Sequence, residues 1–190
     1  MTYKITFCGS IETGKSTLIN LLKEEIEHQN RSVDISYQQN IQSYDKYIKD
    51  MVQYQNELAL SMLFTEQLAS KFQNQSEFLI SENSLFELIA ESKVNLLNKD
   101  FTKQFEKLIF NSVVNYWDLI IYLPVKTDIQ KKNNIVLLDY RKCIDTELKR
   151  ILKEVKRNNS TTEILELTEV GFHVELAKIK QLLVDKKKLI

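Results

Sequence analysis

Short apolar runs alternate with longer amphipathic segments along most of the chain. Runs rich in β-branched and aromatic residues predict β-strands at residues 3–8, 32–37, 77–81, 117–123 and 163–168. Between them, apolar positions recur with the helical period, which predicts helices at residues 15–29, 42–74, 84–98, 100–115, 139–157 and 172–187. Strands that alternate with helices form parallel βαβ units. We therefore expect an α/β fold of three layers, with a five-stranded parallel sheet flanked by helices.

The pattern gives no sign of a division into domains. The chain has 190 residues, a length that suits one domain with a sizeable core. No repeat, low-complexity block or linker interrupts it, and one proline and three glycines are compatible with long unbroken helices. We therefore expect a single domain over residues 1–190.

Composition and charge favour a small-molecule partner. Lys plus Arg and Asp plus Glu balance at 26 each, so no overall field favours nucleic acid or an anionic membrane. No apolar run approaches the roughly 18 residues of a membrane span, and the N-terminus enters a predicted strand directly, without a signal peptide. Cys8 and Cys143 lie too far apart to form a metal-spaced pair. We expect a cytoplasmic protein that binds neither nucleic acid nor membrane. The sequence leaves open whether it forms a homodimer.

Two of the three glycines lie in one stretch, Gly9-Ser10-Ile11-Glu12-Thr13-Gly14-Lys15-Ser16-Thr17, which fits the G-x-x-x-x-G-K-[ST] pattern of a phosphate-binding P-loop. The glycines let the backbone turn and approach a polyphosphate closely. Successive N–H groups then point at phosphate oxygens at the positive end of the next helix. Lys15 adds a charge over the β- and γ-phosphates, and the Ser16 hydroxyl is placed to ligate Mg²⁺. A predicted strand precedes the motif and a predicted helix follows it, so we expect a P-loop NTPase fold.

Other motifs must decide which P-loop protein this is. A small GTPase needs D-x-x-G after its third strand, but the only other glycine is Gly171, with no aspartate three residues before it. Val125-Lys126-Thr127-Asp128 is similar to the guanine-reading N-K-x-D, with Val125 in place of the asparagine. A GTPase-like protein therefore stays as a minor alternative.

Three segments together resemble a family. Ile5 to Leu18 resembles the G-N-I-x-x-G-K-S-T-L opening of deoxynucleoside kinases, and is also similar to kinases of the ribosylnicotinamide-kinase and thymidylate-kinase types. Phe78-Leu79-Ile80-Ser81-Glu82-Asn83-Ser84-Leu85-Phe86 is similar to their E-R-S or D-R-S segment after the third strand. Asp118-Leu119-Ile120-Ile121-Tyr122-Leu123 resembles their fourth strand, which leads into a lid. The resemblance implies ATP-dependent phosphoryl transfer to a nucleoside or nucleotide.

The resemblance also implies roles for single residues. Glu82 falls where the family places an acid near Mg²⁺ and the phosphates, so Ser16 and Glu82 are the predicted metal ligands. Asn83 stands where these kinases have an arginine that stabilises charge around the acceptor. Tyr37-Gln38-Gln39 stands where deoxynucleoside kinases have a glutamate that acts as general base. These two departures keep open the alternative of a non-catalytic or regulatory nucleotide-binding module.

A lid is expected around residues 125–141, because phosphoryl transfer requires positive charge to reach the transferring group. Arg141 is the best candidate for that charge, because it is closest to the expected lid and precedes the body of a predicted helix. Lys15, Glu82 and Arg141 are thus the predicted catalytic residues. Arg150 and Arg157 share a helix face that is typical of a solvated, salt-bridging surface.

Two further segments have candidate contacts with the nucleotides. In the predicted helix 42–74 an apolar and aromatic stripe packs in a core or lines an acceptor pocket; it comprises Tyr44, Tyr47, Met51, Tyr54 and Leu58. In P-loop kinases the region after strand five often touches the adenine, which makes Phe172 and His173 candidates for that contact.

Overall fold

A computed structural model of the protein describes residues 2–36, 76–82, 84–94, 103, 107, 116–126, 135–158 and 161–189. Its centre is a five-stranded sheet in which every neighbouring pair is parallel. The strand order is β2-β3-β1-β4-β5. The strands are β1 (Tyr3–Gly9), β2 (Val33–Ser36), β3 (Phe78–Ser81), β4 (Leu119–Leu123) and β5 (Glu163–Glu166). The α/β fold with a parallel sheet predicted from the sequence is thereby confirmed.

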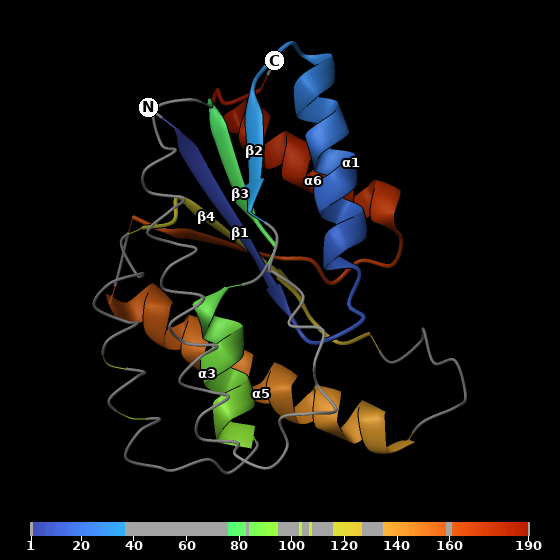
Figure 1. Ribbon diagram of the computed structural model, residues 1–190, viewed down its shortest axis with the longest axis vertical. Coiled ribbons are helices and arrows are strands. Elements are labelled where there is room, and N and C mark those ends of the chain that lie inside the picture. Colours follow the sequence, from blue (N-terminus) through green and yellow to red (C-terminus); the bar gives the residue numbers. More distant parts are fainter. Residues whose placement is uncertain are drawn as a thin grey trace.

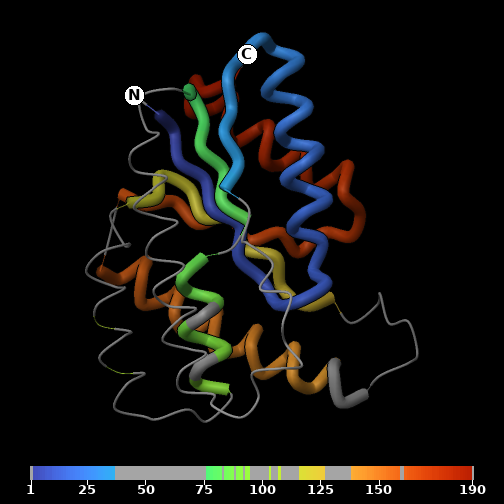
Figure 2. The backbone as a smooth tube through the Cα atoms, in the orientation of Figure 1, coloured from blue at the N-terminus to red at the C-terminus, as the bar shows by residue number. Residues whose placement is uncertain are grey.

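Two pairs of helices cover opposite faces of this sheet (Figures 1 and 2). Alternate side chains of a strand point to opposite faces, and β4 is apolar on both of them, whereas β1 presents Tyr3, Ile5 and Phe7 to one face and Cys8 to the other. One set packs with α1 (Lys15–His28) and α6 (Phe172–Asp185). The other set packs with α3 (Leu85–Val94) and α5 (Ile135–Asn158). The described part of the chain therefore has three layers, and β1 lies at the centre of the middle one.

The structure shifts some of the predicted boundaries. α5 begins at Ile135, four residues before the predicted start. The sequence did not indicate this first turn, because the four successive apolar residues Ile135–Leu138 carry no periodicity that distinguishes a helix from other structure. β5 ends at Glu166 rather than residue 168, although the Leu167 N–H still donates to the Tyr122 carbonyl at 2.9 Å. The predicted helices at 42–74 and most of 100–115 lie outside the described residues.

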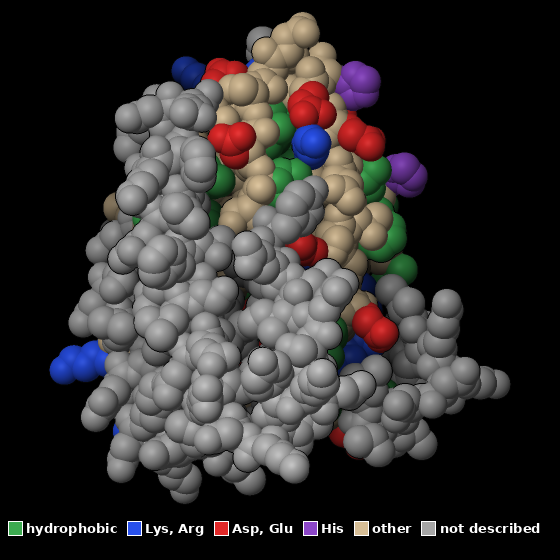
Figure 3. Space-filling model, viewed as in Figure 1, with side chains coloured by type: hydrophobic (Ala, Val, Ile, Leu, Met, Phe, Trp, Pro, Cys, Tyr) green, Lys and Arg blue, Asp and Glu red, His purple; other side chains and the backbone are tan. Residues whose placement is uncertain are grey.

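None of the helices in the described part of the chain combines the length and the apolar character that crossing a membrane requires. On the described part of the face in Figure 3, acidic and basic side chains lie side by side, as the balanced composition predicts.

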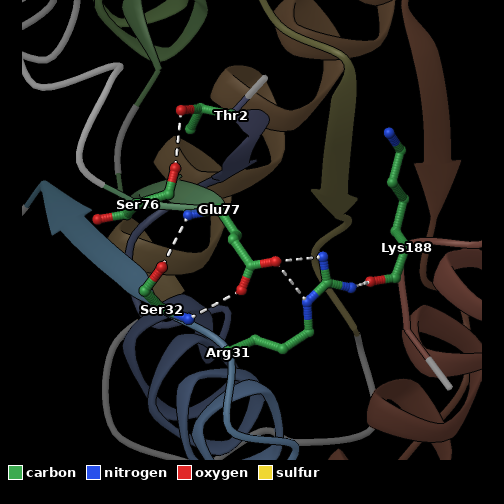
Figure 4. A network of polar contacts seen from close by, with 6 residues as sticks. All are labelled: Thr2, Arg31, Ser32, Ser76, Glu77 and Lys188. Atoms are coloured by element: carbon green, nitrogen blue, oxygen red, sulfur yellow. Dashed lines mark hydrogen bonds and ion pairs between the residues drawn. The ribbon is translucent and has the colours of Figure 1, made fainter.

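A polar network closes the amino-terminal edge of the sheet, at the end opposite the P-loop (Figure 4). The Arg31 guanidinium donates to Glu77 Oε1 from Nε at 3.1 Å and from Nη2 at 2.8 Å, and donates through Nη1 to the Lys188 carbonyl. It also lies 5.0 Å from the centroid of the Phe78 ring. Arg31 therefore ties the approach to β2, the approach to β3 and the C-terminal tail together.

This network predicts a difference between two arginines. Arg31→Ala should lower the free energy of unfolding by about 1 kcal/mol or more, because it loses a bond to a backbone carbonyl and an aromatic contact. Arg150→Ala is the matched control, since Arg150 pairs with Glu147 and Glu154 of its own helix. Its loss should cost less. Urea denaturation measures both variants, and equal costs would contradict the bridging role of Arg31.

Candidate phosphate-binding site

The P-loop connects the C-terminal end of β1 to the start of α1. Gly9 is the last residue of β1, and a Cβ at this position would lie 2.5 Å from the Leu123 carbonyl oxygen and 2.8 Å from Thr13 Oγ1. Only a glycine therefore lets β1, β4 and the loop come this close together. Gly14 caps α1 with φ 94° and ψ 14°, a left-handed conformation that glycine adopts without strain. Both glycines of the motif are thus required by the geometry.

Phe172, the first residue of α6, packs against the second glycine. A Cβ on Gly14 would lie 2.6 Å from Cε1 of the Phe172 ring. The residue is still 41% exposed, so part of the ring remains open beside the P-loop. The sequence placed Phe172 and His173 near the nucleotide base; the structure brings Phe172 to the P-loop, and leaves His173 exposed.

Lys15 folds back over the loop that precedes it. Its Nζ donates to the Gly9 carbonyl at 2.6 Å and to the Ser10 carbonyl at 3.1 Å, and lies 3.4 Å from Glu87 Oε2. The side chain is only 11% exposed. The ammonium is therefore held inside the loop, in the place from which it can reach a phosphate bound there.

Glu87 is the site residue that sequence reasoning missed. It lies on α3, with its side chain 10% exposed, and its Oε1 accepts the Gly9 N–H at 3.0 Å. Burial and, less strongly, Glu91 raise the pKa of Glu87, while Lys15 and the Gly9 N–H lower it, and the result is a pKa of about 8. A signal was available: Glu87 is an acid inside the apolar run Leu85–Ala90.

Ser16 and Glu82 lie together, as their predicted metal role requires. The Ser16 hydroxyl, from the first turn of α1, donates to Glu82 Oε1 immediately after β3. A hydroxyl and a carboxylate are hard oxygen ligands of the kind Mg²⁺ prefers, and Mg²⁺ beside a polyphosphate needs few protein ligands. In the part of the chain that the structure describes, no group of three or more acidic, His or Cys side chains is placed to hold a metal ion. The pair therefore fits a magnesium ion that a nucleotide shares.

Arg141 reaches the P-loop from α5. Its Nη1 lies 3.4 Å from Glu12 Oε2, and Nη2 donates to the Glu12 carbonyl at 3.3 Å. Its side chain is 17% exposed, and its buried Nε has no hydrogen-bond partner among the described residues. Glu12 itself has a positive φ of 58° at the tip of the loop. The guanidinium thus lies against the P-loop.

Asp145, one turn after Arg141, fixes α5 to the sheet. Its Oδ1 accepts the Tyr122 hydroxyl and the Val125 N–H, the latter at 3.0 Å, and Lys149 Nζ lies 3.0 Å from Oδ2. The carboxylate is nearly buried. Asp145 therefore sets the position of Arg141 relative to β4, a role that the sequence did not indicate.

Two of the remaining basic candidates pair with acidic side chains outside the P-loop. Lys126 forms an ion pair with the buried Glu175 of α6, and burial lowers the pKa of Lys126. Arg150 pairs along its own helix and Arg157 is exposed, as predicted for a solvated face. Within the predicted lid, residues 135–141 belong to α5, while residues 127–134 lie outside the described residues.

The acceptor side of the predicted site lies outside the described residues. This holds for Asn83, for Tyr37-Gln38-Gln39 and for the stripe from Tyr44 to Leu58. The P-loop residues Gly9–Thr17, together with Glu82, Glu87 and Arg141, make up the described part; we call this set the phosphate site. Ile11, Glu12, Ser16 and Thr17 are exposed in it, and Ser10 is buried.

The sheet order, the P-loop and the helices on both faces define a P-loop fold, and solved structures of nucleoside and nucleotide kinases match nearly the whole chain. Deoxyadenosine kinase from M. mycoides with bound dATP matches with a TM-score of 0.68 and 19% identity, over 95% of this chain and 98% of that one. The same enzyme with the products dCMP and dCDP gives a TM-score of 0.61 and 18% identity, over 96% and 98%. Thymidylate kinase from Ehrlichia chaffeensis gives 0.67 and 12%, over 96% and 98%. No protein-family model and no curated protein matches the sequence.

The contact between Gly14 and Phe172 predicts a coupling between the two residues. Gly14→Ala should lower the free energy of unfolding by about 1–2 kcal/mol through its left-handed backbone alone, and by more through the collision with the ring. In a Phe172→Ala background only the backbone part should remain. Urea denaturation of the four proteins of this double-mutant cycle gives the coupling. An equal cost in both backgrounds would contradict the contact.

The buried carboxyl predicts a pH dependence of stability. The pKa of Glu87 in the folded protein, about 8, lies above its ordinary value of 4.5, so the folded state binds more protons between these values. The stabilisation is complete below pH 4.5 and is lost as the pH rises through 8. Stability of the wild type should therefore fall between about pH 5 and pH 8 and level off above it, and Glu87→Gln should flatten that fall. Urea denaturation across this range tests the expectation. Glu154→Gln on α5 is the control and should keep the wild-type slope.

Proposed function

We propose that the protein transfers the γ-phosphoryl group of ATP to a nucleoside or nucleotide, with Mg²⁺ as its cofactor. The observation that carries the proposal is the meeting of Lys15, the Ser16–Glu82 pair and Arg141 at one P-loop. The fold supports the same conclusion, since the matching structures are a deoxyadenosine kinase and a thymidylate kinase.

The residues of the phosphate site divide the work of binding and positioning. The N–H groups of the loop and of the first turn of α1 hold the phosphates at the positive end of the helix. Lys15 lies within the loop and neutralises charge on the transferring group. Ser16 and Glu82 would hold a bound Mg²⁺, Glu82 directly or through water. The ion would supply further neutralisation of the phosphate charge.

Arg141 completes the charge balance from α5. Transfer of a phosphoryl group depends on positioning and on electrostatic stabilisation, and a guanidinium at the transferring group is a strong contributor. Arg141 reaches Glu12 of the P-loop through both terminal nitrogens of its guanidinium. This guanidinium is the positive charge that we assign to the transferring phosphate.

A second function is a nucleotide-binding module without catalysis. It is favoured by two features of the sequence, the asparagine at position 83 and the absence of an acid in Tyr37-Gln38-Gln39. A guanine-specific, GTPase-like function has less support, because the Lys126 ammonium of the N-K-x-D-like segment is paired with Glu175.

The first test removes the P-loop charge. Lys15→Ala should abolish phosphoryl transfer with little loss of fold, because Glu87, whose pKa is about 8, is mostly protonated at neutral pH and leaves little buried charge unpaired. Lys23→Ala on α1 is the matched control, since Lys23 forms only an i,i+4 pair with Glu27 in the described part of the chain. It should retain full activity. The measurement is product formed from ATP, Mg²⁺ and each common nucleoside or nucleoside monophosphate.

Two results of that assay would contradict the proposal. One is transfer by Lys15→Ala at the wild-type rate. The other is nucleotide binding by the wild type without turnover of any acceptor, which would favour the non-catalytic module. Asn83→Arg separates the two functions further, because a working kinase gains little from the added arginine.

A further inference from the structure

Glu87 is an unusual residue in a phosphate site, because its side chain is acidic and buried. Its carboxyl group is buried beneath the P-loop, where it contacts the loop at both ends: Oε1 accepts the N–H of Gly9, and Oε2 lies 3.4 Å from Lys15 Nζ. A negative charge at this place opposes the binding of a polyphosphate. The Glu87 carboxylate therefore stabilises Lys15 and Gly9 of the loop, but its negative charge would repel a polyphosphate bound there.

The ionisable groups around Glu87 come from three elements. Lys15 faces it from the start of α1 and Glu91 from the next turn of α3. Cys8 lies on β1, and burial raises the pKa of its thiol well above the ordinary value, so it stays neutral. From α5, which packs against α3, Asp145 contributes to the field at Cys8, and its carboxylate is bound by Tyr122, Val125 and Lys149. Lys15 is thus a cation in direct contact with Glu87.

We propose that Glu87 is a positioning residue of the phosphate site, which holds Lys15 and the Gly9 N–H in the empty P-loop and takes up a proton from solvent when a nucleotide binds. The proposal rests on the proposed function only as far as nucleotide binding. The bound phosphates draw on the charge of Lys15 and add their own negative charge. Both changes favour the neutral form of a carboxyl group that is shielded from water.

The neutral form keeps the structural contact. A protonated carboxyl group still offers one oxygen to the Gly9 N–H, so the end of β1 remains held in place. Lys15 is then released from its anionic partner and is available to the phosphates. One residue therefore stabilises the loop in both states, and its charge changes between them.

The direction of the pH dependence follows from proton linkage. Burial raises the pKa of Glu87 to about 8 in the nucleotide-free protein, and bound phosphates raise it further. Nucleotide therefore binds the protonated form more tightly. Between pH 7 and pH 9 the Kd of the wild type should increase roughly five- to tenfold, since each pH unit above the free pKa costs up to a factor of ten.

The test is calorimetric titration of the full chain with MgADP. At pH 8, in two buffers of different ionisation enthalpy, the wild type should take up about half a proton more than Glu87→Gln, because half of the free carboxyl groups are ionised at their pKa. Glu87→Gln should also give the same Kd at pH 7 and pH 9. Glu91→Gln removes the same charge one turn further along α3 and should keep most of the pH dependence.

Several outcomes would overturn the proposal. Equal proton uptake by the wild type and Glu87→Gln is one, and a loss of affinity in Glu87→Gln that is the same at both pH values is another, since it marks a purely structural role. A pH dependence removed by Glu91→Gln instead is the third. Proton-linked MgADP binding without turnover would contradict the kinase function and leave this inference standing, whereas a wild type that binds no MgADP would contradict both.

Discussion

The phosphate site depends on the position of β1 between two parallel partners. Ladders with β3 and β4 align Thr6 with Ser81 and Gly9 with Leu123, so three strands end at one edge of the sheet. The P-loop, Glu82 and the segment that leads to Val125 all begin there. The approach at Gly9 is so close that a Cβ would collide with the Leu123 carbonyl oxygen, and this constraint fixes both the residue type and the path of the loop. The chemistry of the site follows from where these strand ends meet.

Each helix that packs on the sheet then places at least one side chain of the site at that edge. α1 presents Lys15 and Ser16 at its positive end, and α6 covers Gly14 with the Phe172 ring. On the other face, α3 places Glu87 beneath the loop, and α5 carries Arg141 to Glu12. The apolar clusters on the two faces hold these helices rigidly, which is what positions charged side chains of different elements within hydrogen-bond reach. Core packing and the phosphate site are therefore parts of one arrangement.

The sequence predicted the framework and the groups that local patterns specify. The strands, the P-loop and the pairing of Ser16 with Glu82 follow from periodicity, a motif with a strict spacing and a resemblance at residues 78–86. Glu87 and Asp145 escaped prediction because their partners are the Gly9 N–H, the Tyr122 hydroxyl and the Val125 N–H, which lie far away in sequence. No local pattern encodes which face of α3 or α5 meets which strand end. The early start of α5 was not predicted for another reason: an apolar run without periodicity is compatible with several secondary structures.

A phosphate site also has to exist without its ligand, and this explains why a buried acid lies beside the P-loop lysine. Lys15 is only 11% exposed in the nucleotide-free protein, and an ammonium group shielded from water needs partners. Two backbone carbonyls and Glu87 supply them. A permanent carboxylate would weaken every later contact between Lys15 and a phosphate, whereas a carboxyl group near its titration point satisfies the lysine when the loop is empty and loses its charge when phosphates arrive. The same low polarity that makes Lys15 effective toward a phosphate raises the pKa of Glu87 far enough for this exchange.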